Sequence, residues 1–290
     1  MNYRQSIFIL LPVCLLLQCD LINPDESVPA FILINPFELQ TDPGVQGSAS
    51  HKITEGWLTV NGEFLGAYQL PATVPVLMEG PADVVVEAGI KDNGISTTPD
   101  IYPFYSPYET SVTLIPDETA TVNPKVSYDR NTKFSFIEDF ESGATLFQDL
   151  LQGQTGLTVS DEDVFEGSYS GRIELTDTDP VVEVATLNEY PGLTDQSPYV
   201  YLEVNYRSEA PVIFGLIGGR GTSSRNSVYD PGFNPKETWN KIYFNLSGLL
   251  ATSPFDAHQI GLQAYLPTEN GQFTTSQATV WLDNIKLVHF

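Results

Sequence analysis

Residues 278–290 read ATVWLDNIKLVHF, and this closing segment carries the pattern that decides the fold. Apolar residues recur at alternate positions, with Trp281, Ile285 and Leu287 on one face, which is the period of a β-strand. Asp283 lies between Trp281 and Ile285 on that same face. A carboxylate on an apolar face requires a hydrogen bond, an oppositely charged partner or a metal ion. We therefore predict a buried strand in which the carboxylate of Asp283 requires such a partner.

Runs of the same kind occupy the sequence before this strand, from residue 134 onward. Eight further candidate strands alternate in polarity or are rich in β-branched and aromatic residues: 133–141, 155–160, 169–176, 181–187, 199–208, 211–219, 238–247 and 259–266. The helical candidates, 144–151 and 247–252, are short. Many strands separated by polar loops predict a jelly-roll sandwich over residues 134–290.

Residues 30–126 contain a second set of short alternating runs and no helical period. Asn61-Gly62 separates two of these runs, and this dipeptide is typical of a two-residue hairpin because both turn positions need a positive φ. Residues 127–133 are polar and lack a core pattern, so we place a linker there. The predicted fold class is all-β, with two β-sandwich domains of which the second is a jelly roll.

The N-terminal segment has the features of an export signal. Arg4 precedes an apolar run that is too short to span a bilayer, and both cysteines of the chain, Cys14 and Cys19, lie near its end. A disulfide between them would close a very small loop and would connect no other part of the chain. The segment resembles a bacterial lipoprotein signal, although Gln18 stands where a small residue usually precedes the cysteine. An ordinary signal peptide is the alternative.

The lipoprotein resemblance implies how the chain is processed and where it resides. Residues 1–18 would be the signal peptide, Cys19 would carry covalent lipid including palmitate, and residues 19–29 would form a tether. Acyl chains contribute roughly 0.8 kcal/mol per buried methylene, so several of them hold a protein on a membrane. We expect a lipid-anchored protein of the cell envelope, in the outer membrane.

Both predicted sandwiches resemble known families. Residues 60–89, VNGEFLGAYQLPATVPVLMEGPADVVVEAG, resemble PEGA-type and carboxypeptidase-regulatory-like β-sandwiches in their order of strands, turns, glycines and prolines. In the second sandwich, four landmarks follow one another as in jelly rolls of the carbohydrate-binding-module type: FIEDFESG, VFEGSYSGRIEL, TWNKIYFNLSGL and VWLDNIKLV. This resemblance implies a glycan as the ligand of the second sandwich.

The same resemblance implies a structural calcium ion. In such modules, carboxylates of the first and last strands often bind Ca²⁺, and here they correspond to Glu141, Asp283 and Asp139. Calcium takes six to eight oxygen ligands, and neighbouring acidic groups repel one another without a cation. The alternative is that these are solvated acids at strand ends, or that Asp283 caps a neighbouring backbone.

Aromatic side chains on loops are the candidates for sugar stacking, with amides and acids available for the hydroxyl groups. The predicted jelly roll offers six of them as ligand-binding residues: Tyr190, Tyr199, Tyr229, Phe233, Tyr265 and Phe273. For each one, packing beneath its own loop is the alternative. Trp239 and Trp281 lie inside strand patterns and are predicted to pack in the core.

The net charge and the absence of catalytic motifs narrow the classes of function that the chain can have. The formal net charge of −24 argues against nucleic acid as a partner, because phosphate binding needs clustered lysine and arginine. The three histidines lie near no catalytic motif, and no G-x-S-x-G is present. We therefore predict a non-catalytic envelope lipoprotein that binds glycan through its jelly roll. The alternative is a structural or assembly subunit that binds other envelope proteins of a secretion, adhesion or motility apparatus.

Overall fold

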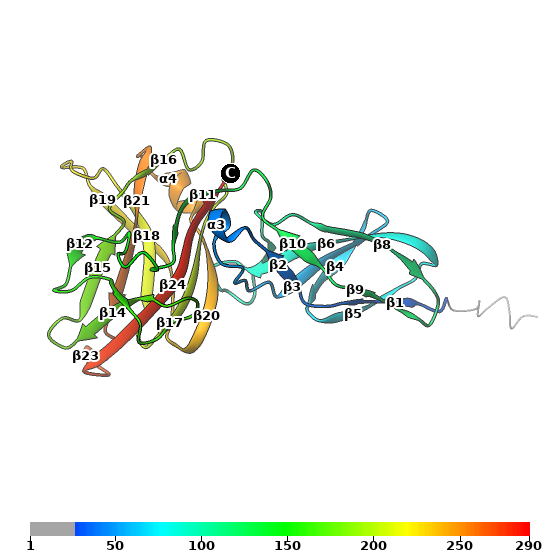
Figure 1. Ribbon diagram of the computed structural model, residues 1–290, viewed down its shortest axis with the longest axis horizontal. Coiled ribbons are helices and arrows are strands. Elements are labelled where there is room, and N and C mark those ends of the chain that lie inside the picture. Colours follow the sequence, from blue (N-terminus) through cyan, green and yellow to red (C-terminus); the bar gives the residue numbers. More distant parts are fainter. Residues whose placement is uncertain (1–26) are drawn as a thin grey trace, which may run out of the picture.

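The computed structural model describes residues 27–290 as two β-sandwiches packed end to side (Figure 1). Regular structure in these residues is almost entirely strand, which confirms the predicted all-β fold class. Within this part of the chain, no helix is long and apolar enough to cross a membrane. The predicted signal peptide, Cys19 and most of the tether lie outside the described residues.

The first sandwich begins at Ala30. Its elements are β1 (Ala30–Ile34), β2 (Glu38–Gln40), α3 (Pro43–Gln46), β3 (Glu55–Val60), β4 (Glu63–Gln69), β5 (Ala72–Val76), β6 (Gly80–Lys91), β7 (Pro99–Ile101), β8 (Tyr108–Leu114), β9 (Thr119–Val122) and β10 (Lys125–Ser127). One sheet has the order β4-β3-β6-β7, with β8 also paired to β6, and it faces the sheet β5-β1-β9. Asn61 and Gly62 both have positive φ, as the hairpin dipeptide predicts.

The second sandwich begins at Lys133. Its elements are β11 (Lys133–Glu138), β12 (Asp149–Gln152), β13 (Thr158–Ser160), β14 (Ser170–Thr176), β15 (Val181–Ala185), β16 (Tyr190–Pro191), β17 (Val200–Ser208), β18 (Val212–Gly218), β19 (Asn226–Phe233), β20 (Lys236–Asn245), α4 (Ser247–Thr252), β21 (Ala257–Tyr265), β22 (Thr268–Glu269), β23 (Gln272–Phe273) and β24 (Gln277–His289). The helix predicted at 247–252 is α4, whereas 144–151 contains β12 and no helix.

Two sheets enclose the core of the second sandwich. We call the sheet β13-β14-β24-β17-β20, to which β11 is added through β24, the junction sheet. We call the sheet β12-β15-β21-β18-β19, to which β16 is added through β21, the distal sheet. Alternate residues of β17, such as Leu202 and Val204, and of β21, such as Ile260 and Leu262, fill the space between them. The other residues of each strand therefore point to the outer faces.

The closing strand β24 changes its alternation partway along its length. Asn284 has a φ of 47°, and the register between β24 and β17 shifts at this point. Leu282 and Ile285 consequently both face the core. Trp281 instead faces outward, where the Arg207 guanidinium lies 4.8 Å from its ring centroid. This corrects the prediction that Trp281 packs in the core beside Ile285, because a bulge adds one residue and reverses the inward set.

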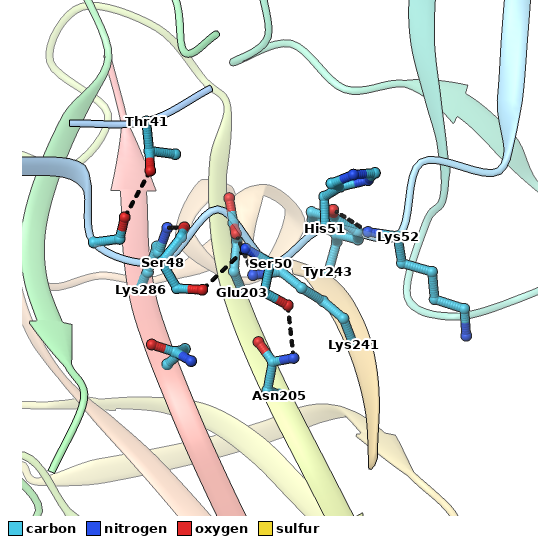
Figure 2. A network of polar contacts seen from close by, with 12 residues as sticks. Thr41, Ser48, Ser50, His51, Lys52, Glu203, Asn205, Lys241, Tyr243 and Lys286 are labelled. Atoms are coloured by element: carbon cyan, nitrogen blue, oxygen red, sulfur yellow. Dashed lines mark hydrogen bonds and ion pairs between the residues drawn. The ribbon is translucent and has the colours of Figure 1, made fainter. Parts of the chain in front are cut away.

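The outer face of the junction sheet packs against the first sandwich. Tyr201, Tyr243 and Val288 point outward from this sheet and belong to the hydrophobic cluster of the first sandwich. A loop of the first sandwich, residues 48–52, runs across the same face (Figure 2). Lys52 N donates a hydrogen bond to the Tyr243 hydroxyl at 2.9 Å. The two sandwiches thus share both an apolar contact and a set of polar contacts.

Glu203 lies at the centre of this junction and is fully buried (Figure 2). Its Oε1 accepts hydrogen bonds from the hydroxyls of Tyr102 (2.8 Å) and Tyr128 (2.7 Å), and its Oε2 lies 2.7 Å from Lys241 Nζ. Burial alone would raise the pKa of Glu203, but the charges of Lys241 and Lys286 and these hydrogen bonds lower it on balance. The buried charge is therefore compensated from both sandwiches.

Candidate functional site

The distal sheet turns its outer face away from the first sandwich (Figure 1). Along β21, Ile260, Leu262 and Ala264 are buried in the core, so Gln259, Gly261, Gln263 and Tyr265 form the outward set. The rise from Gln259 to Tyr265 is about 20 Å for an extended strand. We call this outer surface, with the side chains that reach it from β12, β15, β18 and β19, the distal face.

Tyr229 of β19 lies flat across the middle of the distal face. It pairs with Gly215 of β18, which in turn pairs with Gly261 of β21. A Cβ atom on Gly215 would overlap the Val228 carbonyl oxygen and would lie 2.9 Å from Tyr229 Cδ1, and one on Gly261 would lie 2.9 Å from both the Tyr229 hydroxyl and Ile217 Cδ1. The ring therefore extends over two glycines: a side chain at Gly261 would displace it, and one at Gly215 would also collide with the backbone of β19.

A hydrogen bond fixes the far end of this ring. The Tyr229 hydroxyl donates to Glu183 Oε1 of β15 at 2.7 Å. Burial and this contact with Glu183 raise the pKa of Tyr229, so the phenol stays protonated and acts as the donor. One side chain thus spans the sheet from β19 to β15, with its ring against the glycines, and it remains half-buried.

A charged network borders the ring on the side of Gln259. Arg225 Nη2 donates to Asp149 Oδ2 and to Gln259 Oε1, both at 3.0 Å, and Gln259 Nε2 donates to Asp149 Oδ2 at 3.0 Å. Burial alone would raise the pKa of Asp149, but the hydrogen bonds from Gln259 and Arg225 and the nearby positive charges lower it on balance. Gln259 is fully buried and its amide is satisfied within the network, so Asp149 and Arg225 are the members that reach the surface beside the ring.

The six aromatic candidates have different surroundings. Tyr229 and Tyr265 share the distal face, and Tyr265 is 37% exposed. Phe233 is buried in the core, where its ring stacks on Tyr206 at 3.7 Å between centroids, so it is not a surface residue. This corrects the prediction that Phe233 lies on a loop: it ends strand β19, in which alternate residues point inward. The remaining three candidates, Tyr190, Tyr199 and Phe273, do not form a group with Tyr229 and Tyr265.

Those three candidates lie at separate places. Tyr190 is half-buried and packs on Phe136, with ring centroids 5.2 Å apart. Tyr199 is exposed in the loop before β17, and Phe273 is exposed on the short hairpin of β22 and β23. The structure therefore brings together two of the six candidates. For Tyr190, packing against the core is what the alternative interpretation expected.

The carboxylates proposed for calcium contact one loop through its backbone N–H groups. Glu141 Oε1 accepts from Ser168 N (2.7 Å) and Tyr169 N (2.9 Å), and Asp283 Oδ2 accepts from Glu166 N (3.2 Å). Burial raises the pKa of Asp283 to about 7 in spite of these donors.

Asp139, the third predicted ligand, is exposed and accepts a hydrogen bond from Glu141 N at 3.2 Å. Among residues 27–290, no three His, Cys, Asp or Glu side chains are grouped as a metal site requires. As arranged, Glu141 and Asp283 cap a loop, and calcium at Glu141, Asp283 and Asp139 stays a prediction.

Several site residues were not selected from the sequence. Glu183, Asp149, Gln259 and Arg225 come from strands or turns whose pairing the sequence does not show. Gly215 and Gly261 carried a usable signal, because a glycine inside a strand pattern often marks close approach by another group. Two such glycines on neighbouring strands would have pointed to the position of Tyr229.

A further cleft lies elsewhere, at one end of the second sandwich. This cleft has a volume of about 570 Å³ and is lined by residues that include Asp195, Ser253, Asp256 and His258. The Ser253 Oγ lies 2.6 Å from His258 Nε2, and Ser253 Oγ also accepts a hydrogen bond from Phe255 N at 3.3 Å. Burial lowers the pKa of His258. These contacts close the turn after α4, and the imidazole is neutral at physiological pH.

Comparison with known proteins gives only distant matches. No family model matches the chain, and no curated protein matches it. Three of the solved structures that resemble part of it are carbohydrate-binding modules.

The first, TmCBM61 in complex with β-1,4-galactotriose, is 12% identical, with a TM-score of 0.33, over 53% of this chain and 95% of that one. The CBM22-2 xylan-binding domain from Paenibacillus barcinonensis Xyn10C is 14% identical, with a TM-score of 0.37, over 53% of this chain and 99% of that one. A family 29 module variant complexed with cellulohexaose is 15% identical, with a TM-score of 0.33, over 56% and 92%. Identities and scores this low carry no argument about the ligand of this chain.

Proposed function

We propose that this chain is a non-catalytic lipoprotein of the cell envelope that binds a glycan through the distal face. The observation that carries the proposal is the Tyr229 ring, which lies across Gly215 and Gly261 and is fixed at its hydroxyl by Glu183. A ring held parallel to a sheet offers one face to the apolar side of a sugar. Because its orientation is fixed before binding, little conformational entropy is lost on contact.

The groups around the ring suit the rest of a sugar chain. Asp149 and Arg225 lie on one side of it, held by the buried Gln259, and Gln263 and Tyr265 follow on the other side along β21. Hydroxyl groups both donate and accept hydrogen bonds, so carboxylates, amides and guanidinium groups can each engage them. Gln259 itself is fully buried, so the length of β21 available to a ligand runs from Gly261, beneath the Tyr229 ring, to Tyr265, which is about 13 Å and suits a short oligosaccharide.

The test is a glycan array with the purified chain, followed by titration of the best-bound oligosaccharide. Tyr229→Ala should weaken binding about tenfold or more, because it removes both the stacking surface and the bond to Glu183. Tyr199→Ala removes an equally large exposed ring away from the distal face and should bind as the wild type does. Failure to bind any glycan would favour the alternative, a structural or assembly subunit that contacts other envelope proteins.

Two parts of the proposal concern the attachment and integrity of the protein. Lipid on Cys19 would anchor the chain to the outer membrane, and the first sandwich would separate the glycan-binding domain from the bilayer. Calcium at Glu141, Asp283 and Asp139 would stabilise the second sandwich without taking part in ligand contact. Each of these parts has its own experiment in the Discussion.

A further inference from the structure

A small pocket at the junction of the two sandwiches is lined by lysines. The whole chain has seven lysines, and four of them, Lys52, Lys91, Lys236 and Lys241, line this one pocket of about 140 Å³. Its other lining residues are Gly94, Tyr206, Asn240, Ile242 and Tyr243, so no carboxylate lines it. In a chain with 37 acidic and 13 basic residues, such a concentration of positive charge is unexpected.

Ion pairs neutralise only two of the four lysines. Lys91 pairs with Glu55, and Lys241 pairs with Glu203 of the buried junction. Lys52 and Lys236 have no carboxylate within ion-pair distance in the described part of the chain. Four positive charges against two negative ones leave a surplus of two at this pocket.

The two lysines without an ion-pair partner within the described residues, Lys52 and Lys236, repel each other. Burial, and next the positive charge of Lys236, lower the pKa of Lys52. Lys52 Nζ also donates to Asn240 Oδ1, and Asn240 Nδ2 donates to the Tyr206 hydroxyl at 3.0 Å. Hydrogen bonds therefore hold the donors of Lys52 and Asn240 in place, and an anion between Lys52 and Lys236 would relieve the repulsion between these two lysines.

Both sandwiches contribute to this wall. Lys52, Lys91 and Gly94 come from the first sandwich, whereas Lys236, Asn240 and Lys241 come from β20 of the second. The hydrogen bond from Lys52 N to the Tyr243 hydroxyl fixes the backbone of Lys52 against β20. The junction thus fixes the backbone of Lys52 beside β20, the strand that carries Lys236.

We propose that this junction pocket binds a single oxyanion group, namely a sulfate, a phosphate or a carboxylate. A volume of about 140 Å³ admits one such group together with the ends of the lysine side chains. The group could be a free ion or an acidic substituent of a polysaccharide, since both present the same charged oxygens. The pocket borders the junction sheet, so it is separate from the distal face and does not depend on glycan binding there.

The experiment is isothermal titration of the full-length chain, purified in detergent, with inorganic sulfate, inorganic phosphate and an oligogalacturonide. The test variant is Lys52→Gln/Lys236→Gln, and the matched control is Lys125→Gln/Lys133→Gln, which changes the net charge equally at exposed sites outside the pocket. We expect binding of at least one probe, weakened about tenfold or more in the test variant, because each lost contact is a charge-assisted hydrogen bond. The control variant should match the wild type.

The three probes separate the two sources of the group. Binding of the inorganic ions supports the site as one for a free oxyanion, whereas binding of the oligogalacturonide alone supports an acidic glycan substituent. Absence of binding for all three probes, or equal weakening in both double variants, would overturn the proposal. Tyr229→Ala should leave the binding of the inorganic ions unchanged, because neither ion offers a sugar ring to the distal face, and this distinguishes a failure here from a failure of the distal face.

Discussion

The Tyr102 hydroxyl of the first sandwich donates a hydrogen bond of 2.8 Å to Glu203 of the second, across the junction between them. Tyr102 and Glu203 are both fully buried. A carboxylate in such a place is stable only when its charge and its lone pairs are satisfied, and here the partners belong to both sandwiches. The contact therefore couples the folding of one sandwich to the presence of the other.

Removing Glu203 should destabilise the whole protein. Glu203→Ala leaves Lys241 and Lys286 without their buried counter-charge, at an expected cost of roughly 3–5 kcal/mol in the free energy of unfolding. Tyr102→Phe removes one bond to a charged acceptor and should cost about 1.5–3 kcal/mol. Urea denaturation measures both effects, and Glu38→Gln, at an exposed ion pair, is the control without a measurable change. Two separate unfolding transitions in the wild type would contradict this coupling.

Gly261→Ala should impair binding more than it impairs stability. The new methyl group would lie 2.9 Å from the Tyr229 hydroxyl, so the ring must tilt and its bond to Glu183 must lengthen. We expect weaker affinity for the glycan found on the array and a small change in melting temperature. Gly248→Ala, where no atom lies within 4 Å of the added methyl, is the matched control. Equal affinity in both variants would show that the position of the ring does not matter.

The chain should lose stability as the pH falls below about 6.5, partly through His258. Burial lowers the pKa of His258 in the folded protein, so the unfolded chain binds a proton that the folded one does not. That contribution is present above the unfolded pKa and is lost as the pH falls through the folded one. His258→Gln should flatten the slope of stability against pH between neutrality and pH 5. Ser253→Ala keeps the imidazole and should retain the slope, so a flat profile there would contradict this assignment.

The proposed calcium gives a direct expectation for chelation. A chelator should lower the melting temperature of the wild type, because the buried carboxylate of Asp283 would lose its counter-charge. Asp283→Asn has no such charge to neutralise and should not respond to the chelator or to added calcium. A wild-type melting temperature that is the same with chelator and with calcium would remove the metal from the proposal.

The proposed anchor is tested by metabolic labelling with a fatty-acid analogue. Cys19→Ala should abolish incorporation of the label and release the chain from the membrane fraction, because the acyl chains supply the binding energy. Cys14→Ala changes the other cysteine of the same segment and should leave labelling intact. Label that persists in the Cys19→Ala chain would exclude this residue as the modified one.

The all-β class could be predicted because it depends on local alternation, and strands such as β17 and β24 show that alternation clearly. β19 was missed because Pro231 and Gly232 interrupt it and such residues are typical of loops. The strand tolerates them because it lies at the edge of the distal sheet. The bulge at Asn284 was also missed, and with it the outward position of Trp281, since one positive φ leaves little trace in composition.

The candidate site was predictable only in part, for a similar reason. Tyr229 and Tyr265 stand out in the sequence as aromatic residues among polar ones. Their common face depends on β21 pairing with β15 and β18, and Glu183 becomes a partner of Tyr229 only through that pairing. Contacts between residues far apart in sequence arise from topology, which residue type alone does not encode.

The burial of Glu203 between the two sandwiches also limits how far one sandwich can move relative to the other. Two sandwiches on a flexible linker would let the far one sample a wide volume, whereas two sandwiches that share a buried contact keep one relative orientation. Any recognition surface on the second sandwich is then presented at a constant distance and angle from the first sandwich. Neighbouring copies on the same support would display their surfaces in a common layer, which favours simultaneous capture of long, repetitive polymers over that of small, freely diffusing molecules.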